Sequence, residues 1–402
     1  MAGNAEIISR RSSKPKGTAE RCKPMNLFKK EEKKVEYLEL IYDLIFVYMV
    51  GRNNALIHNI QNGFVEPKFF IGYVLCTLAI IQIWNFSTLY INMFGRNSIR
   101  DHVFLFINMY LLYFVGQSTG SDWQAFQTQY YIAWGLILLN IGIQFLIELR
   151  NHRMTEWNKK FIKRMSTVLF VEAGLVFIAA FLSPIPGAWV TAAAILSGIL
   201  LTTVFSKQKF IGGWIDFAHL TERAMLYVVL TFGEMIIAVA SYFNGDGGLS
   251  WNTIYFSLMA FLIVVGLFLS YGIFYDHLID RDGQYDGMLY MGIHVFIIFS
   301  MNNITASLEF MREPEIAVMP KMLFLLASFA GYFIFLFCLQ GHIRNRDKLT
   351  RTICARASVL TVIFVVLMIL LRENMYINIF LSVVYVFAVF LIIYRTRAEI
   401  IG

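Results

Sequence analysis

Twelve apolar runs, each about 20 residues long, constrain the fold of this chain more than any other feature of its sequence. The runs are continuous rather than alternating, a pattern that predicts membrane-spanning helices and excludes a transmembrane β-barrel. The composition agrees, because 58% of the 402 residues are hydrophobic and 15% are charged, against about 25% charged in a soluble domain. We therefore predict an all-α, polytopic transmembrane bundle of about 12 spans. The predicted spans are 37–58, 68–93, 102–119, 129–149, 165–183, 188–206, 219–242, 252–275, 288–310, 321–341, 355–371 and 375–394.

The basic residues predict the orientation of the bundle. If the amino terminus is cytoplasmic, 28 of the 34 Lys and Arg residues fall in cytoplasmic segments and 4 fall in outer loops. The positive-inside rule then places both termini in the cytoplasm. Residues 1–35 are predicted to form a disordered basic tail. We assign its charge to topology and to anionic membrane lipids rather than to nucleic acid, so no nucleic-acid partner is expected.

The even number of runs predicts two transmembrane halves, residues 36–210 and 211–397. At an offset of 192 residues, His102-Val103-Phe104 coincides with His294-Val295-Phe296, and the large basic loops also coincide. Two halves with six spans each would share one orientation. The sequence therefore predicts a 6+6 parallel repeat about an axis along the membrane normal.

Ionisable residues inside the first run are the strongest functional candidates. A charge near the bilayer centre costs about 2.5–3.5 kcal/mol, so such a group usually faces a cavity or a partner. Glu39 and Asp43 share one helical face, and Asp43 lies about 9 Å into the helix. We expect Asp43 to be either paired with a buried cation or part of a conducting path.

The seventh run contains a second cluster, His219-Leu-Thr-Glu222-Arg223, followed by Gly233-Glu234. The spacing of His219, Glu222 and Arg223 predicts that they bridge locally. Arg223 and Glu234 lie about 16 Å apart along a helix, so Glu234 needs a partner from another helix, or a proton. His219 and Glu222 have the spacing of metal ligands, but no third ligand is evident and no metal is expected.

Three further polar residues lie inside apolar runs. Asn85 follows Trp84 in the second run, Glu172 lies deep in the fifth, and His294 lies well inside the ninth. His294 is either a proton-relay residue or a histidine satisfied by packing. We find no catalytic, nucleotide-binding or cofactor-binding motif, so neither enzymatic activity nor a cofactor is expected.

Two sequence motifs resemble the bacterial low-temperature-requirement A (LtrA) family of membrane proteins. The first is Glu39-Leu-Ile-Tyr-Asp43-Leu-Ile-Phe-Val47, and the second is His219-x-x-Glu222-Arg223 followed by Gly233-Glu234. Trp84-Asn85 and His294 fit the same pattern, and the resemblance extends over about residues 36–395. It implies a bacterial inner-membrane protein associated with growth at low temperature, and it leaves the biochemical activity open.

Three functions remain compatible with these residues. The first is a transporter or channel, proton-linked, for a small solute or ion. The second is a sensor, scaffold or lipid-homeostasis component in which the buried charges only pair helices. The third is a membrane-embedded lipid enzyme, which would need His219, Glu222 and Asp43 to converge. The polar-core candidates for all three are Glu39, Asp43, Asn85, His219, Glu222, Arg223, Glu234 and His294. The sequence does not specify the substrate or the oligomeric state.

Overall fold

The computed structural model describes residues 34–117, 123–150, 154, 156–206, 215–244, 250–283, 285–311, 313–343 and 351–401. All of them belong to one unit, Lys33–Gly402. Nearly all of the predicted tail over residues 1–35 lies outside the described residues. So do Lys207 and Lys209 of one predicted cytoplasmic loop.

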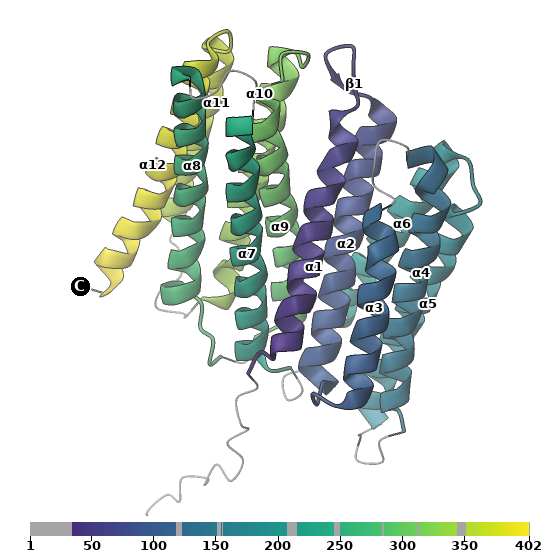
Figure 1. Cartoon of the computed structure of the whole chain (residues 1–402). Helices are drawn as coiled ribbons and strands as arrows, with labels where there is room; N and C mark the ends of the chain where they lie inside the picture. Colours follow the sequence, from purple (N-terminus) through teal and green to yellow (C-terminus); the bar gives the residue numbers. More distant parts are fainter. Residues whose placement is uncertain are drawn as a thin grey trace, which may run out of the picture. The chain divides into compact units, whose positions relative to one another are not determined.

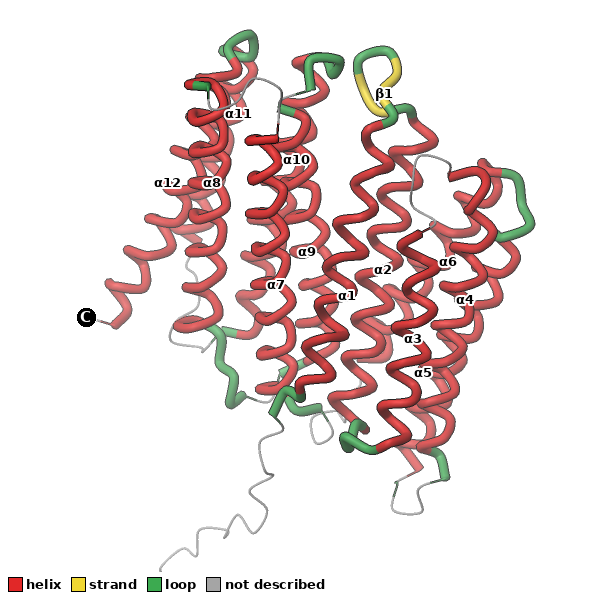
Figure 2. The backbone as a smooth tube through the Cα atoms, in the orientation of Figure 1, coloured by secondary structure: helices red, strands yellow, loops and turns green. Residues whose placement is uncertain are grey.

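Helices account for almost all of the described structure (Figures 1 and 2). In hydrocarbon every backbone N–H and C=O must be bonded within the protein, and a helix does this within one segment. The α-helices are α1 (Tyr37–Asn53), α2 (Pro67–Phe94), α3 (Ile99–Gln117), α4 (Trp123–Glu148), α5 (Glu156–Ala179), α6 (Pro184–Ser206), α7 (Phe217–Ala240), α8 (Trp251–Ile273), α9 (Gly287–Phe310), α10 (Val318–Cys338), α11 (Arg351–Leu370) and α12 (Met375–Ile401). Short 3-10 or π turns extend four of them: η1 (Asn54–His58), η3 (Ser241–Asn244), η4 (Phe274–Leu278) and η5 (Leu339–His342).

The polytopic helical bundle predicted from the sequence is confirmed. Among the described residues, ten helices are long and apolar enough to cross a membrane. The other two predicted spans correspond to α3 and α5. Helix α5 begins with charged residues that continue to Arg164 and leave only its second part apolar, and α3 carries Arg100, Asp101 and Asn108. Both nevertheless pack lengthwise against α4 (Figure 1).

A two-stranded hairpin joins α1 to α2. Strands β1 (Ile60–Gln61) and β2 (Phe64–Val65) pair antiparallel, and Asn62 and Gly63 between them have φ values of 54° and 81°. Glycine tolerates this left-handed backbone because it has no Cβ. The carbonyl of Gly63 accepts a hydrogen bond of 2.7 Å from the amide of Ala317, so the hairpin is tied to the segment before α10.

Helices α1 and α2 connect the early and late helices of the chain. Helix α1 packs against α2, α3 and α7, and α2 also packs against α4, α6, α7 and α9 (Figure 1). Helix α9 packs in addition against α6, α7 and α10, and α8 packs against α12. Residues that lie far apart in sequence are thereby brought together around α1 and α2. These contacts do not test the predicted division at residues 36–210 and 211–397, which stays a prediction.

Candidate functional site

Glu39 and Asp43 of α1 both face the interior of the bundle. They are one helical turn apart and therefore lie on the same face of α1. Glu39 is 4% exposed and Asp43 is fully buried. The opposing helix is α7, and the residue it presents to them is Arg223, which is also fully buried. Two acidic side chains of the first helix thus meet one basic side chain of the seventh.

Arg223 binds both carboxylates. Its Nε donates to Oδ2 of Asp43 at 3.0 Å, and one terminal nitrogen donates to Oδ1 of the same carboxylate. The other terminal nitrogen donates to Oε2 of Glu39. A guanidinium that binds a carboxylate through two parallel hydrogen bonds forms one of the strongest ion pairs in proteins. Asp43 is therefore the main counter-ion of Arg223, and Glu39 shares the same cation.

Trp84 of α2 completes the environment of Asp43. Its indole Nε1 donates to Oδ1 of Asp43 at 2.8 Å. The indole ring also stacks on the ring of Tyr227, one turn beyond Arg223 on α7, with centroids 4.4 Å apart and an interplanar angle of 22°. Asp43 consequently accepts hydrogen bonds from α2 and α7 together, and its carboxylate is fixed in position.

His219 lies on the other side of Glu39. Its Nε2 is 3.5 Å from Oε2 of Glu39, and its Nδ1 is 2.9 Å from Nδ2 of Asn92 on α2. The Oδ1 of Asn92 accepts the backbone N–H of Asp216 at 3.0 Å, which orients the Asn92 amide so that its nitrogen faces the imidazole. The amide nitrogen can only donate, so Nδ1 of His219 accepts and the ring proton of the neutral imidazole sits on Nε2. This nitrogen lies 3.5 Å from Glu39 Oε2 without forming a hydrogen bond.

A branch of neutral polar groups extends from α1 toward α4. The hydroxyl of Tyr42 lies 3.0 Å from Oγ of Ser87 and accepts a hydrogen bond from Asn108 of α3 at 3.1 Å. Asn140 of α4 in turn donates to Asn108 at 2.7 Å. Each of these side chains is buried, so this network links four helices through the apolar interior.

Residues 34–394 match the protein family described as "Bacterial low temperature requirement A protein (LtrA)". The match covers nearly the whole chain. The chain belongs to this family. It is a bacterial multi-pass membrane protein, and the resemblance inferred from its two motifs is confirmed. Neither the search of curated proteins nor the search of solved structures found a match.

The LtrA motifs of α1 and α7 meet in space. Glu39 and Asp43 belong to the first motif, and His219 and Arg223 belong to the second. Arg223 reaches across to α1, so it does not form the local bridge along α7 that the sequence predicted. Glu222 is half-buried, and in the described part of the chain it has no hydrogen bond or ion pair to this cluster. Sequence spacing identifies only neighbours on the same helix, whereas Arg223 pairs with carboxylates on α1.

Glu234 of this LtrA chain lies apart from the cluster, farther along α7. It is half-buried, and its carboxylate lies against Gly51 of α1, where a Cβ would come within 2.5 Å of Oε1. Arg223 and Glu234 therefore have different neighbours, as expected from their predicted separation along α7. A second acidic side chain, Glu309 of α9, has its Oε2 3.8 Å from Nε2 of His58.

Asparagine side chains form a second polar cluster in the LtrA fold, near the other end of α1. Asn302 of α9 donates to Asn54 at 3.2 Å and to the hydroxyl of Tyr73 at 2.9 Å. That hydroxyl donates to Asn303 at 2.7 Å, and Asn53 donates to Thr77 at 3.4 Å. The contacts join α1, α2 and α9.

His294 is satisfied by neighbours on α8 and α9. Its Nδ1 is 2.8 Å from the carbonyl of Tyr290, and its Nε2 is 3.0 Å from the hydroxyl of Tyr271. The ring can therefore donate from Nδ1 and accept at Nε2 as a neutral imidazole. This geometry agrees with the packing interpretation of His294. Asn85 does not join the Asp43 cluster either, although it directly follows Trp84.

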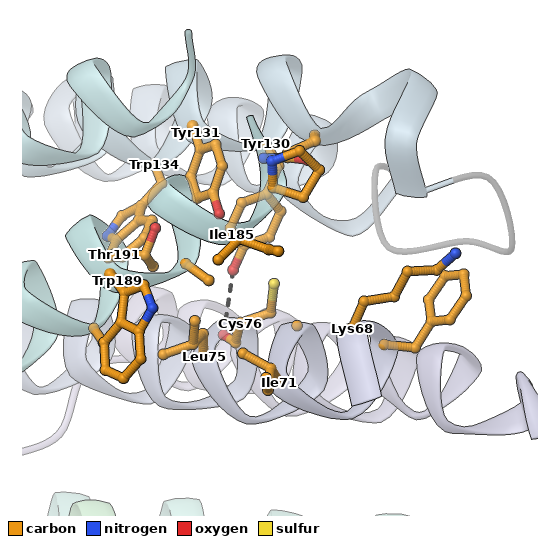
Figure 3. A pocket seen from close by; sticks show the side chains of 16 residues that line it. Lys68, Ile71, Leu75, Cys76, Tyr130, Tyr131, Trp134, Ile185, Trp189 and Thr191 are labelled. Atoms are coloured by element: carbon orange, nitrogen blue, oxygen red, sulfur yellow. Dashed lines mark hydrogen bonds between the residues drawn. The ribbon is translucent and has the colours of Figure 1, made fainter. Parts of the chain in front are cut away.

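An apolar pocket of about 320 Å³ lies between α2, α4 and α6 (Figure 3). Aromatic side chains line it from α4 and α6, and Lys68 lies at its edge; the labelled lining residues are Lys68, Ile71, Leu75, Cys76, Tyr130, Tyr131, Trp134, Ile185, Trp189 and Thr191. None of the predicted polar-core residues lines it. The pocket suits an apolar molecule rather than an ion.

Sequence reasoning named Trp84 only as part of the family pattern and not as a partner of Asp43, and it missed Asn92. Both lie on α2, and their separation of eight positions places them near one helical face. The available signal was this pair of hydrogen-bond donors within a predicted span, because a buried donor requires an acceptor. The described residues contain no group of three His, Cys, Asp or Glu side chains that could hold a metal ion.

Proposed function

We propose that this LtrA protein is a proton-linked transporter of a small solute or ion, and that Glu39 binds the proton. The observation that carries the proposal is that two buried carboxylates share the guanidinium of Arg223. Arginine stays charged in proteins, so it supplies a fixed positive charge to both. Asp43 takes two of its hydrogen-bonding nitrogens, which leaves Glu39 as the carboxylate suited to gain and lose a proton.

The position of Glu39 supports this assignment. It lies in the first turn of α1, close to the end of the helix, whereas Asp43 lies one turn deeper. Nε2 of His219 lies 3.5 Å from Oε2 of Glu39, and Asn92 fixes the tautomer in which this nitrogen carries the proton. A protonated Glu39 would release its share of Arg223. Proton binding would thereby change the contact between α1 and α7.

Two polar clusters separated by an apolar stretch suit a transporter in a closed conformation. Glu39 and Asp43 lie at one end of α1, and Asn53 and Asn54 lie at the other. Between them the side chains of Phe46 and Val50 are buried, with exposures of 0% and 3%. We propose that a solute or ion passes between the clusters when α1 and α7 move apart.

The location belongs to the same proposal. The excess of basic residues on one side of the predicted spans supports a cytoplasmic membrane with both termini in the cytoplasm. Glu39 would then take its proton from the cytoplasmic side. The apolar pocket of Figure 3 supports contact with membrane lipids, and the family's name supports a role in growth at low temperature.

A second candidate function is a sensor, scaffold or lipid-homeostasis component. The observation that favours it is the fixed geometry of Asp43, which is fully buried and bonded to both Arg223 and Trp84. In that case the ion pair would join helices without carrying a proton. We do not propose a lipid enzyme, because in the described part of the chain the residue beside His219 is Glu39 and not Glu222.

Proton flux into reconstituted vesicles tests the proposal. An imposed pH gradient should dissipate faster in vesicles with the wild-type protein than in empty vesicles, with a pH-sensitive dye inside as the readout. Glu39→Gln should abolish the difference. Glu36→Gln, the same change three residues earlier at the N-cap of α1, is the matched control and should retain the flux. Equal flux in wild type and Glu39→Gln would favour the scaffold, provided that both variants are folded.

A further inference from the structure

Glu172 of α5 is a fully buried carboxylate that lies outside the charged cluster. Its Oε2 accepts a hydrogen bond of 3.4 Å from Nε2 of Gln82 on α2, and its Oε1 has no hydrogen-bond partner. In the described ranges of the chain, no basic side chain forms an ion pair with it. An isolated negative charge is costly in such a place, so it needs a positive partner or a proton.

Two amide oxygens on α2, one of them on the Gln82 that donates to Glu172, also lack partners. The Nε2 of Gln82 is used by Glu172 and by the carbonyl of Ile195 at 3.3 Å, and its Oε1 is buried and unpartnered. Asn85, one turn later on α2, has an unpartnered Oδ1 as well. Gln82 is 2% exposed and Asn85 is 7% exposed. Buried polar atoms normally have a partner, so several unpaired acceptors together indicate a missing donor or cation.

Gln82 and Asn85 line the same small cavity, which Thr202 of α6 and Gly292 of α9 help to close. Its volume is about 10 Å³, about the space that one water molecule needs. Only a small species fits. The cavity is therefore too small for an organic solute and suits a single ion.

Gly198 of α6 is what allows Glu172 and Gln82 to meet. A Cβ at this position would lie 2.0 Å from Nε2 of Gln82 and 2.4 Å from Oε2 of Glu172. The backbone of α6 therefore closes the site without a side chain. Helices α2, α5 and α6 thus meet around the Glu172 carboxylate and the Gln82 amide, and Gln82 in turn lines the small cavity together with Asn85.

We propose that this site binds one monovalent cation of the size of Na⁺. Its ligands are the carboxylate of Glu172 and the amide oxygens of Gln82 and Asn85. Small hard cations take oxygen ligands, and one carboxylate balances one positive charge, whereas a divalent ion would leave an excess charge buried. The proposal does not depend on proton transport by Glu39, because the two sites share no residue. They are adjacent on α2, where Trp84 and Asn85 are consecutive.

Thermal unfolding of the purified protein tests the cation site. The unfolding midpoint is followed as NaCl replaces choline chloride at constant ionic strength. A ligand that binds only the folded state stabilises it by mass action, so the midpoint should rise by about 2 °C or more and reach a plateau. Glu172→Gln should abolish this rise. Glu234→Gln, which changes a half-buried carboxylate on α7, is the matched control and should show the wild-type rise.

A second variant guards against misfolding of Glu172→Gln. Asn85→Leu keeps the carboxylate but removes one oxygen ligand, and it should raise the half-saturating Na⁺ concentration about tenfold, which corresponds to about 1.4 kcal/mol. No Na⁺ dependence in the wild type would overturn the proposal, as would an equal dependence in Glu172→Gln. A midpoint that responds to acidification of the wild type but not to Na⁺ would show instead that Glu172 holds a proton. The readout does not involve Glu39, so it can fail while proton flux is intact.

Discussion

Hydrogen bonds from two helices stabilise the Asp43 carboxylate in the apolar interior of the bundle, where an unpaired charge would be unfavourable. Arg223 and Trp84 each donate to it, and neither leaves the interior of the bundle. Buried ion pairs are weak evidence for stability by themselves, because desolvation offsets their attraction. Breaking one is different. Removing one partner leaves an uncompensated buried charge. Single substitutions in the cluster should therefore lower the free energy of unfolding measurably, even if the intact ion pair adds little to it.

Arg223→Met should be among the most destabilising single changes at this site. It removes the guanidinium from two buried carboxylates, and the loss of one partner from a buried ion pair costs about 3–5 kcal/mol. Thermal or denaturant unfolding in detergent measures the loss. Arg372→Met is the matched control, because Arg372 is half-exposed and pairs with the exposed Glu373. Equal, small effects of the two changes would mean that Arg223 is not the cation of the cluster.

Trp84→Phe separates hydrogen bonding from ring packing. Phenylalanine can still stack on Tyr227, but it cannot donate to Asp43. A hydrogen bond to a charged group contributes about 1.5–3 kcal/mol, so we expect a loss of unfolding free energy in that range. Trp189→Phe, at a side chain that is 75% exposed, should change it by less than about 0.5 kcal/mol. The hydrogen bond is refuted if the two variants unfold alike.

Sequence reasoning located Glu39, Asp43, His219 and Arg223 because a charge inside an apolar run is expensive. It could not pair them correctly. The pairing depends on which face of α1 meets α7, and that follows from the packing of the whole bundle. Trp84 was missed as a partner of Asp43 for the same reason, since aromatic residues make up 16% of the chain and only its contact distinguishes this one.

At the scale of helices, close packing depends on glycines that face rings on a neighbour. Gly135 and Gly142 of α4 are two turns apart and meet the rings of Phe177 and Phe170 on α5. Small residues allow membrane helices to approach closely. This contact also explains how α5 is retained in the bundle although its first part is charged. The sequence predicted each helix from its apolar run, but not which glycines would lie at interfaces.

Gly142→Ala should weaken the contact between α4 and α5. The new Cβ would lie 2.5 Å from Cε1 of Phe170, and overpacking of this kind costs about 1–3 kcal/mol. Gly174→Ala on α5 is the control, because a Cβ there meets nothing within 4 Å. That change should leave stability equal or up to about 1 kcal/mol higher, since alanine favours helix. Unfolding midpoints that order the two variants the other way would contradict the packing.

At the scale of the whole molecule, the helical bundle follows from the sequence. A long, continuously apolar segment in lipid must bond its own backbone N–H and C=O groups, and a helix does this within one segment. The two halves at residues 36–210 and 211–397 remain a prediction. Contacts between early and late helices, such as α1 with α7 and α2 with α9, are equally compatible with a repeat and with a single assembly. The short hairpin after α1 was not predicted, since four strand residues lie within a segment expected to link two spans.

Reporter fusions test the topology on which the direction of proton entry depends. A reporter that is active only in the cytoplasm should be active when fused after α12. The same reporter should be inactive when placed beside Glu315, in the segment between α9 and α10, which the positive-inside rule assigns to the outer face. The opposite pattern would invert the bundle and place Glu39 at the outer surface.

Infrared difference spectroscopy of the reconstituted protein tests the central claim most directly, namely that Glu39 exchanges a proton beside Arg223 and His219. Acidification should convert carboxylate absorption into the carbonyl stretch of a protonated acid. We predict one such band in the wild type that disappears in Glu39→Gln and persists in Glu36→Gln. A spectrum that is unchanged by Glu39→Gln would contradict proton exchange at Glu39. The charged cluster would then only hold α1 and α7 together.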